Sequence, residues 1–431
     1  MNPSEYAIYR HRRDALIEIL RDENPEVVEG ALIVFAGFEQ DDRNLFRQES
    51  SFYYLTGVKE PGSVLVSYFD GSDVLYLPVY SGKREQWVTS ALKHDETSAG
   101  IIQVDEIKHL GLPQRGYSLN SFVGQNTYFN LLNDLSQFLH NPEAQVFTFK
   151  DKTTPRYIYQ MHAFDYLSSQ LPALSKATHD CSYIVHELRK CKDDYEIDCM
   201  HKAAQITSLA HNAAAATILP GKTEREVQAM VESIFTVTGA SRPAFPSIIA
   251  SGKNSTILHY TDRNKELKEG DLVVVDIGSE FNYYASDITR TYPVSGKFTS
   301  RQKEIYDIVL NTQSYIESIA APGMYLNNPE KSDKSLHHLA IEYLKKAGGY
   351  DKYFVHNIGH FLGLDVHDVG DISLPLEEGH VITIEPGIYI PEESIGIRIE
   401  DDYVIIDGGC LPLSGQLSKT TEEIESLMAE R

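Results

Sequence analysis

The sequence predicts a mixed α/β protein with a smaller N-terminal domain and a larger C-terminal domain that contains an internal repeat. Two observations support this fold class. Over the first 150 residues, short apolar runs flanked by Gly, Asp or Pro alternate with helical stretches. In the C-terminal half, a ten-residue apolar pattern with a carboxylate at its eighth position occurs twice. We place the domains at residues 1–175 and 176–431.

The N-terminal domain is predicted to contain a mixed sheet. Its clearest strands are short and apolar: Ala31–Phe35, Ser63–Tyr68 and Val74–Val79. Helices are expected over Tyr6–Leu20 and Tyr157–Leu171. The segment ELRKCKDDYEID at 187–198 is dense in charge, so we expect it to cross the surface between the two domains.

Three helices are predicted in the C-terminal domain. Apolar residues recur every three or four positions from Glu196 until Pro220 and Gly221 end the pattern. Thr223 and Glu226 resemble a capping box, which predicts that the next helix begins there. A third helix is expected over Gln302–Ala321, before a strand-rich stretch at 380–406.

The internal repeat pairs EGDLVVVDIG at 269–278 with EGHVITIEPG at 378–387. The eighth position is Asp276 in the first copy and Glu385 in the second. Each copy is followed by a strand with another carboxylate, Asp287 or Glu400, which lies 11 or 15 residues further on. Hairpins of this length bring the two acids of each copy side by side. The repeat therefore predicts a pseudo-twofold domain with a site where its halves meet.

Four carboxylates among Val, Ile and Thr residues are costly if they are buried without partners. One interpretation places them on solvated strand faces, and the other gives them a cluster of cations. The run Leu272–Asp276 is apolar up to its acid, which favours a covered strand. An oxygen-rich ligand set suits Mn²⁺, Mg²⁺ or Co²⁺, and four carboxylates balance two divalent ions better than one.

Three histidines lie between the two copies, in FVHNIGHFLGLDVHDVG at 354–370: His356, His360 and His367. Gly359 and Gly363 argue against a regular helix here. A lone histidine is more often structural, whereas three between two acid-bearing hairpins favour a site. We expect one to bind metal and two to contact substrate.

Composition excludes several classes of function. Of 431 residues, 39 are Lys or Arg and 62 are Asp or Glu, so the formal charge is −23. This balance argues against a nucleic acid or an anionic membrane as partner. The chain shows no apolar run of the ~18 residues that a membrane span needs, and its N-terminus does not resemble a signal peptide. Four cysteines without a C-x-x-C pair predict a reducing, cytoplasmic compartment.

The motif HxxGHxxGLxxHD, together with VDIG, SDITRT, TIEPGIYI and GIRIEDD, resembles the pita-bread metallopeptidases, and within them the aminopeptidase P and prolidase branch. FRQESSFYYLTGVKEPGSVLV at 46–66 is similar to the aminopeptidase P N-terminal domain, and TEEIESLM at 421–428 to its ending. The resemblance covers essentially the whole chain. It implies a pita-bread catalytic domain and an exopeptidase that removes the residue before a proline in second position.

The resemblance also implies roles for individual residues. The family's metal ligands fall on five positions: Asp276, Asp287, His360, Glu385 and Glu400. Of these, Asp287 and Glu400 would bridge two ions, most simply Mn²⁺, with Co²⁺ or Zn²⁺ as alternatives. In the family a metal-bridging hydroxide attacks the substrate carbonyl, and Glu385 matches the glutamate that handles the proton.

The substrate side of the site is implied in the same way. Its matching residues are His259, His356, His367, Tyr389 and Arg398, with His259 and His367 beside the carbonyl and oxyanion. Trp87 is either a core residue or a pocket wall from a neighbouring subunit, and a homo-oligomer, dimer or tetramer, is expected.

Two other functions stay open at this point. A prolidase, which cleaves only Xaa-Pro dipeptides, shares the catalytic domain. A non-catalytic pita-bread binding protein would lack metal ligands, and all five are present here.

Overall fold

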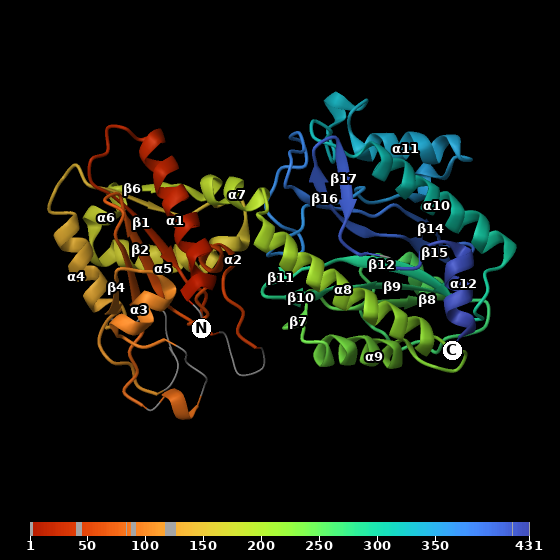
Figure 1. Ribbon diagram of the computed structural model, residues 1–431, viewed down its shortest axis with the longest axis horizontal. Helices are drawn as coiled ribbons and strands as arrows, with labels where there is room; N and C mark the ends of the chain where they lie inside the picture. Colours follow the sequence, from red (N-terminus) through yellow and green to blue (C-terminus); the bar gives the residue numbers. More distant parts are fainter. Residues whose placement is uncertain are drawn as a thin grey trace. The chain divides into compact units, whose positions relative to one another are not determined.

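A computed structural model describes residues 3–39, 45–82, 84–87, 92–116, 126–415 and 417–430 (Figure 1). The chain divides into two compact units, Met1–Leu188 and Arg189–Arg431. Helices and strands mix in both units, which confirms the predicted α/β class.

The first unit contains a six-stranded sheet in the order β4-β3-β2-β1-β5-β6. Strands β1, β2 and β3 pair antiparallel, and the remaining neighbours pair parallel. The strands are β1 (Gly30–Phe35), β2 (Val64–Tyr68), β3 (Asp73–Leu77), β4 (Glu106–His109), β5 (Gln145–Thr148) and β6 (Thr178–Asp180). The three predicted strands are therefore confirmed as its antiparallel part.

Helices pack their apolar faces against this sheet, and the core contains alternate residues of the central strands, such as Ile33 and Val66. The helices are α1 (Pro3–Glu23), α2 (Ser50–Thr56), α3 (Glu96–Ile102), α4 (Phe129–Phe138), α5 (Ile158–Gln170), α6 (Pro172–Lys176) and α7 (Ser182–Lys190), with the 3₁₀ turns η1 (Arg84–Gln86) and η2 (Pro155–Tyr157). Trp87 is 68% exposed, so its interpretation as a core residue is wrong.

The second unit contains four small antiparallel sheets, with strand orders β11-β10-β7, β12-β9-β8, β13-β16-β17 and β14-β15. Its strands are β7 (Arg242–Pro243), β8 (Ile248–Ser251), β9 (Leu272–Ile277), β10 (Ser279–Phe281), β11 (Tyr284–Ala285), β12 (Ile288–Pro293), β13 (Val381–Ile384), β14 (Gly387–Ile390), β15 (Ile395–Arg398), β16 (Asp401–Ile406) and β17 (Gly409–Pro412). The two copies of the sequence repeat form β9 and β13.

Helices α8 and α9 pack against the strands of the first copy, and α10 packs against those of the second (Figure 1). The helices are α8 (Asp194–Thr217), α9 (Glu224–Val237), α10 (Ser300–Ile319), α11 (Leu336–Lys346) and α12 (Thr421–Ala429), with the 3₁₀ turns η3 (Gly252–Thr256), η4 (Pro329–Lys331) and η5 (Tyr350–Tyr353). Thr223 and Glu226 form the predicted capping box. None of the described helices combines the length and apolarity needed to cross a membrane.

Segment 187–198 contains the division between the two units, as predicted, but it does not lie entirely on the surface. Arg189 and Lys192 are buried, and both pair with the buried carboxylate of Asp368. Arg189 also contacts Asp365, with 2.9 Å between Nη2 and Oδ2. A charge-dense run can enter a protein interior when each charge meets an opposite one, and the composition of the run alone does not reveal such partners.

Candidate metal centre

The first two carboxylates lie on one antiparallel hairpin. Asp276 belongs to β9 and is paired with Thr289 of β12, while Asp287 immediately precedes β12. The two acids are therefore diagonal neighbours, and both are buried. Between them, a Cβ atom on Gly278 would lie 1.9 Å from the Ser286 carbonyl oxygen. Only glycine permits this close approach of the two strands.

The other two carboxylates lie on a longer, interrupted hairpin. Glu385 falls between β13 and β14, and Glu400 falls between β15 and β16. The register pairs Ile384 with Asp401 and Gly387 with Arg398, which places Glu385 opposite Glu400. The two hairpins predicted from the repeat are thus present.

A backbone bridge joins the two hairpins at the acids themselves. Thr289 donates its amide hydrogen to the Glu400 carbonyl at 3.3 Å, and Glu400 donates its own to the Thr289 carbonyl at 3.1 Å. The Thr289 hydroxyl also donates to Glu400 Oε2 at 2.6 Å. Acids from both halves of the repeat therefore converge on one place.

The histidine-rich segment crosses the edge of β13 without forming a helix, as its glycines predict. A Cβ atom on Gly359 would lie 2.0 Å from the Thr383 carbonyl oxygen, so glycine lets the loop lie directly against the strand. His360 donates its Nδ1 hydrogen to the Phe361 carbonyl at 3.0 Å. Its Nε2 atom faces Asp287 Oδ2 at 3.5 Å and Glu385 Oε1 at 3.6 Å.

These side chains open into a cavity of about 520 Å³. It is lined by nine of the ten residues that the sequence singles out: His259, Asp276, Asp287, His356, His360, His367, Glu385, Arg398 and Glu400. The tenth, Tyr389, is buried outside the lining. The His360 and His367 rings stack with 4.2 Å between their centroids.

Tyr389 links two of the lining residues. Its hydroxyl accepts a hydrogen from Arg398 Nη1 at 2.9 Å and lies 2.9 Å from His356 Nε2. Because His356 Nδ1 donates to the Asn357 carbonyl at 2.8 Å, Nε2 is the acceptor and Tyr389 donates to it. The chain of hydrogen bonds fixes the orientation of the His356 ring.

Burial raises the pKa of Asp287 and of Glu400 well above the ordinary value, and the neighbouring carboxylates raise both further. Burial also raises the pKa of Glu385, although His360 and Arg398 oppose this shift. For His356, burial and the charge of Arg398 lower the pKa to about 3. For His367, burial and the neighbouring His360 lower it to about 4. Both rings are therefore neutral at pH 7.

This donor set fits divalent metal ions. Donor atoms of Asp287, His360 and Glu400 lie within 4.8 Å of one another. Among the described residues, Asp276 Oδ1 and Asp287 Oδ1 are buried oxygens with no hydrogen-bond partner. The other oxygen of Asp276 pairs with Arg398. Crowded carboxylates with unsatisfied oxygens are stabilised by cations, and oxygen-rich sets with one nitrogen suit hard or borderline ions.

Three supporting residues were missed by the sequence reasoning. Asp402 accepts the Asp287 amide hydrogen on both carboxylate oxygens, at 3.2 and 3.1 Å. Thr383 accepts the His360 amide hydrogen at 3.1 Å and donates to Glu385 Oε1 at 3.3 Å. Thr289, described above, likewise donates its hydroxyl hydrogen to the carboxylate of Glu400. Thr289 lies two positions after Asp287, and Thr383 lies two positions before Glu385. Residues two apart on a strand share a face, so this spacing is the signal that could have found both threonines.

Comparisons with known proteins agree with this geometry. Residues 198–407 match the model of metallopeptidase family M24, and residues 9–112 match that of the aminopeptidase P N-terminal domain. The Xaa-Pro aminopeptidase of Escherichia coli strain K12 is 33% identical over 97% of each chain. Human Xaa-Pro aminopeptidase 3 is 31% identical over 99% of this chain and 86% of its own length. The Xaa-Pro dipeptidase of Pyrococcus furiosus is 43% identical, over 56% of this chain and 66% of its own.

Solved structures give the same result. A variant of Escherichia coli aminopeptidase P matches with a TM-score of 0.83 and 31% identity, over 99% of this chain and 98% of that one. Proline aminopeptidase P II from Yersinia pestis matches with a TM-score of 0.81 and 30% identity over the full length of both chains. The predicted pita-bread architecture is therefore confirmed. The chain belongs to metallopeptidase family M24, and within it to the aminopeptidase P branch.

Proposed function

We propose that this protein is an Xaa-Pro aminopeptidase, a metal-dependent hydrolase that releases the N-terminal residue from peptides with proline in second position. The observation that carries the proposal is the convergence of four carboxylates, three of them buried, and four histidines on one cavity. Similarity to Xaa-Pro aminopeptidases along 97% of the chain supports the same activity.

Divalent metal ions are the cofactors that membership of this metallopeptidase family implies. We assign their binding to Asp276, Asp287, His360, Glu385 and Glu400, with Asp287 and Glu400 shared between two ions. Mn²⁺ is the proposed native metal because four of the five ligands offer hard oxygen donors. Zn²⁺ and Co²⁺ are the alternatives, and a zinc-substituted structure of Escherichia coli aminopeptidase P supports keeping zinc among them.

The bound ions would polarise the substrate carbonyl and make water a stronger nucleophile at neutral pH. Around them, we assign the residues of this chain to binding and proton transfer. Glu385 is placed to receive a proton, because its carboxylate contacts both His360 and His356 at 3.6 Å. His367 and His259 would donate hydrogen bonds to the carbonyl oxygen as its negative charge develops.

The proline side of the site is assigned to His356, Tyr389 and Arg398. Their hydrogen-bonded chain presents one cation and one neutral ring to the cavity. Arg398 is held by Asp276 and by the Thr289 hydroxyl, so its guanidinium is fixed before a substrate enters. A fixed cation beside the proline ring can contact either the peptide carbonyl or a terminal carboxylate.

A prolidase is the second candidate. The 43% identity to the Pyrococcus furiosus Xaa-Pro dipeptidase favours it, but that match covers only 56% of this chain. A match along nearly the whole chain, including the N-terminal domain, is found with aminopeptidases. The non-catalytic alternative has no support, because every residue assigned as a metal ligand is present.

A matched series of peptide substrates distinguishes an aminopeptidase from a prolidase. We expect the manganese-loaded protein to have a higher kcat/KM for an Xaa-Pro-Xaa tripeptide and for a pentapeptide than for the Xaa-Pro dipeptide. Replacing the second-position proline by alanine should lower kcat/KM severely, because the pocket receives a ring and a tertiary amide. Turnover confined to the dipeptide would identify a prolidase, and no turnover of any Xaa-Pro peptide would contradict both candidates.

Three further proposals follow from the sequence and rest on this function. The functional domains are residues 1–175 and 176–431, the protein acts in the cytoplasm, and it forms a homo-oligomer, a dimer or a tetramer. The high exposure of Trp87 is compatible with contact to another subunit.

A further inference from the structure

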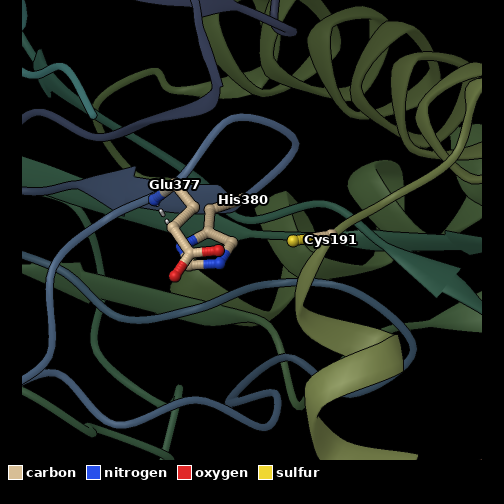
Figure 2. Close-up of side chains that lie close together, drawn as sticks. All are labelled: Cys191, Glu377 and His380. Carbon is tan, nitrogen blue, oxygen red and sulfur yellow. Dashed lines mark hydrogen bonds between the residues drawn. The ribbon is translucent and has the colours of Figure 1, made fainter. Parts of the chain in front are cut away.

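A second group of metal-binding side chains lies outside the cavity described above. Cys191, Glu377 and His380 each offer one donor atom, and the three atoms lie within 4.8 Å of one another (Figure 2). Cys191 lies between α7 and α8, His380 immediately precedes β13, and Glu377 lies shortly before it in the same turn. Cys191 and Glu377 are exposed, whereas His380 is only 1% exposed.

The backbone itself holds two of these side chains together. Cys191 and His380 form an isolated antiparallel bridge, although they are far apart in the sequence. Lys192 donates its amide hydrogen to the Gly379 carbonyl at 2.9 Å, and Ile405 donates its own to the His380 carbonyl at 2.8 Å. Side chains of directly opposed residues in such a bridge lie on one face, about 5 Å apart. The proximity of Cys191 and His380 is therefore a property of the main chain.

The buried ring has an unsatisfied nitrogen. Among the described residues, nothing forms a hydrogen bond with His380 Nε2, and a buried polar atom without a partner is costly. Burial, with the nearby charges of Lys190 and Lys192, lowers the pKa of His380 to about 4, so the ring is neutral at pH 7. A neutral imidazole beside a thiol and a carboxylate has the composition of a zinc-type ligand set.

We propose that Cys191, Glu377 and His380 bind one divalent ion of the Zn²⁺ or Co²⁺ class, with solvent completing the coordination. A thiolate ligand distinguishes this site from the oxygen-rich centre in the cavity and disfavours Mn²⁺ and Mg²⁺. Lys192 is itself paired with Asp368 at 3.3 Å, which limits its repulsion of a cation.

Ion binding requires one local rearrangement. His380 Nδ1 accepts the Glu377 amide hydrogen at 3.1 Å, so the proton of the neutral ring is on Nε2. An ion on Nε2 moves that proton to Nδ1, and the Glu377 amide must then turn away. Glu377 is exposed and starts a turn, so the change is confined to the residue that supplies the third ligand. The lost hydrogen bond lowers the affinity of the site without removing it.

Cobalt absorption tests the site independently of peptidase activity. The reduced, full-length protein is titrated with Co²⁺, and the thiolate-to-cobalt charge-transfer band is followed. The centre in the cavity has oxygen and nitrogen donors, so this band reports a cysteine-bound ion alone. Because the cavity centre also takes up Co²⁺ but gives no such band, we expect the band to saturate at one equivalent of Co²⁺ beyond the cavity ions, and Zn²⁺ to abolish it. Absence of the band at saturating Co²⁺ would overturn the proposal.

Matched variants identify the ligands. Cys191→Ser should remove the band, and Glu377→Gln should weaken Co²⁺ binding by ~10-fold or more. Two control variants make the same chemical changes outside the proposed ligand set. Glu378→Gln removes a carboxylate next to Glu377, and Cys410→Ser removes a thiol elsewhere in the unit. Both should leave the band unchanged. A band that survives Cys191→Ser, or a Glu378→Gln effect equal to that of Glu377→Gln, would refute the assignment. Because no outcome depends on peptide turnover, failure here leaves the proposed peptidase function standing.

Discussion

The two halves of the sequence repeat place their acids differently. In the first half, β9 and β12 form an unbroken ladder, and Asp276 and Asp287 lie diagonally across it. In the second half, the strands stop at the acids, and Glu385 lies directly opposite Glu400. Pro386 follows Glu385 and lacks an amide hydrogen, which accounts for the interruption of that ladder.

The comparison shows that the same sequence pattern can hold its acids in two different ways. The continuous ladder of the first half fixes its acids through the main chain, with Asp402 also holding the Asp287 amide. The interrupted hairpin of the second half relies on hydroxyl groups, because Thr289 and Thr383 contact the carboxylates of Glu400 and Glu385. We therefore expect the halves to respond differently to the loss of supporting groups and similarly to the loss of the acids.

The largest effect should come from removing one shared acid from either half. Asp287→Ala and Glu400→Ala should each lower the bound metal content and reduce kcat by at least ~10², since each removes a group that stabilises transition-state charge through the ions. Metal analysis and kcat on a tripeptide check this. Asp407→Asn, an exposed acid at the end of β16, is the control. Full metal content in either alanine variant would show that the two halves are not equivalent.

Loss of a supporting hydroxyl should have a smaller effect that distinguishes the two threonines. Thr289 donates to Glu400 at 2.6 Å, whereas Thr383 donates to Glu385 at 3.3 Å. Thr289→Val should lower metal affinity by ~10- to 100-fold and Thr383→Val by less, because the shorter bond orients its ligand more strongly. Competition with a chelator measures both affinities. Thr312→Val, which removes a hydroxyl bonded within α10, should have no effect on metal binding. The reverse order would contradict this ranking.

The smallest effect is expected from the buried side chains that donate hydrogen bonds to the backbone carbonyls of each hairpin. Buried His211 donates to the Ile288 carbonyl at 3.0 Å in the first half, and buried Gln313 donates to the Ile384 carbonyl at 3.2 Å in the second. Burial, with the charge of Arg290, lowers the pKa of His211 to about 3. Its neutral form contributes full stability above the unfolded pKa of about 6.5, and that contribution is lost as the pH falls towards 3.

The variant His211→Gln tests the pH dependence, because it gives the first half a glutamine like Gln313 of the second half. Between pH 7 and pH 5, the metal-free wild type should lose about 2 kcal/mol more unfolding free energy than His211→Gln, at about 1.4 kcal/mol per pH unit. Chemical denaturation followed by circular dichroism measures the loss at both pH values. His201→Gln, an exposed histidine on the same helix, should behave as wild type. Parallel pH profiles for wild type and His211→Gln would refute the role of His211.

Much of this arrangement was predictable because it depends on local pattern. The repeat predicted the two hairpins, and Gly359 predicted the irregular loop that carries His360. The contact between Arg398 and Asp276 was not predictable, because it joins residues of different halves and depends on how the halves pack. The buried pairing of Lys192 with Asp368 was missed for the same reason, since a charged run carries no information about distant partners.

The bridge between Thr289 and Glu400 has a consequence for folding. In the proposed ligand assignment, neither half supplies a complete set of ligands, so an ion that binds both halves would bind only the assembled unit. Its binding energy then adds to the cooperativity of the whole unit rather than to the stability of one hairpin. A local opening of either hairpin would release the ions, so we expect slow amide exchange at Thr289 and Glu400 to mark the fully assembled state.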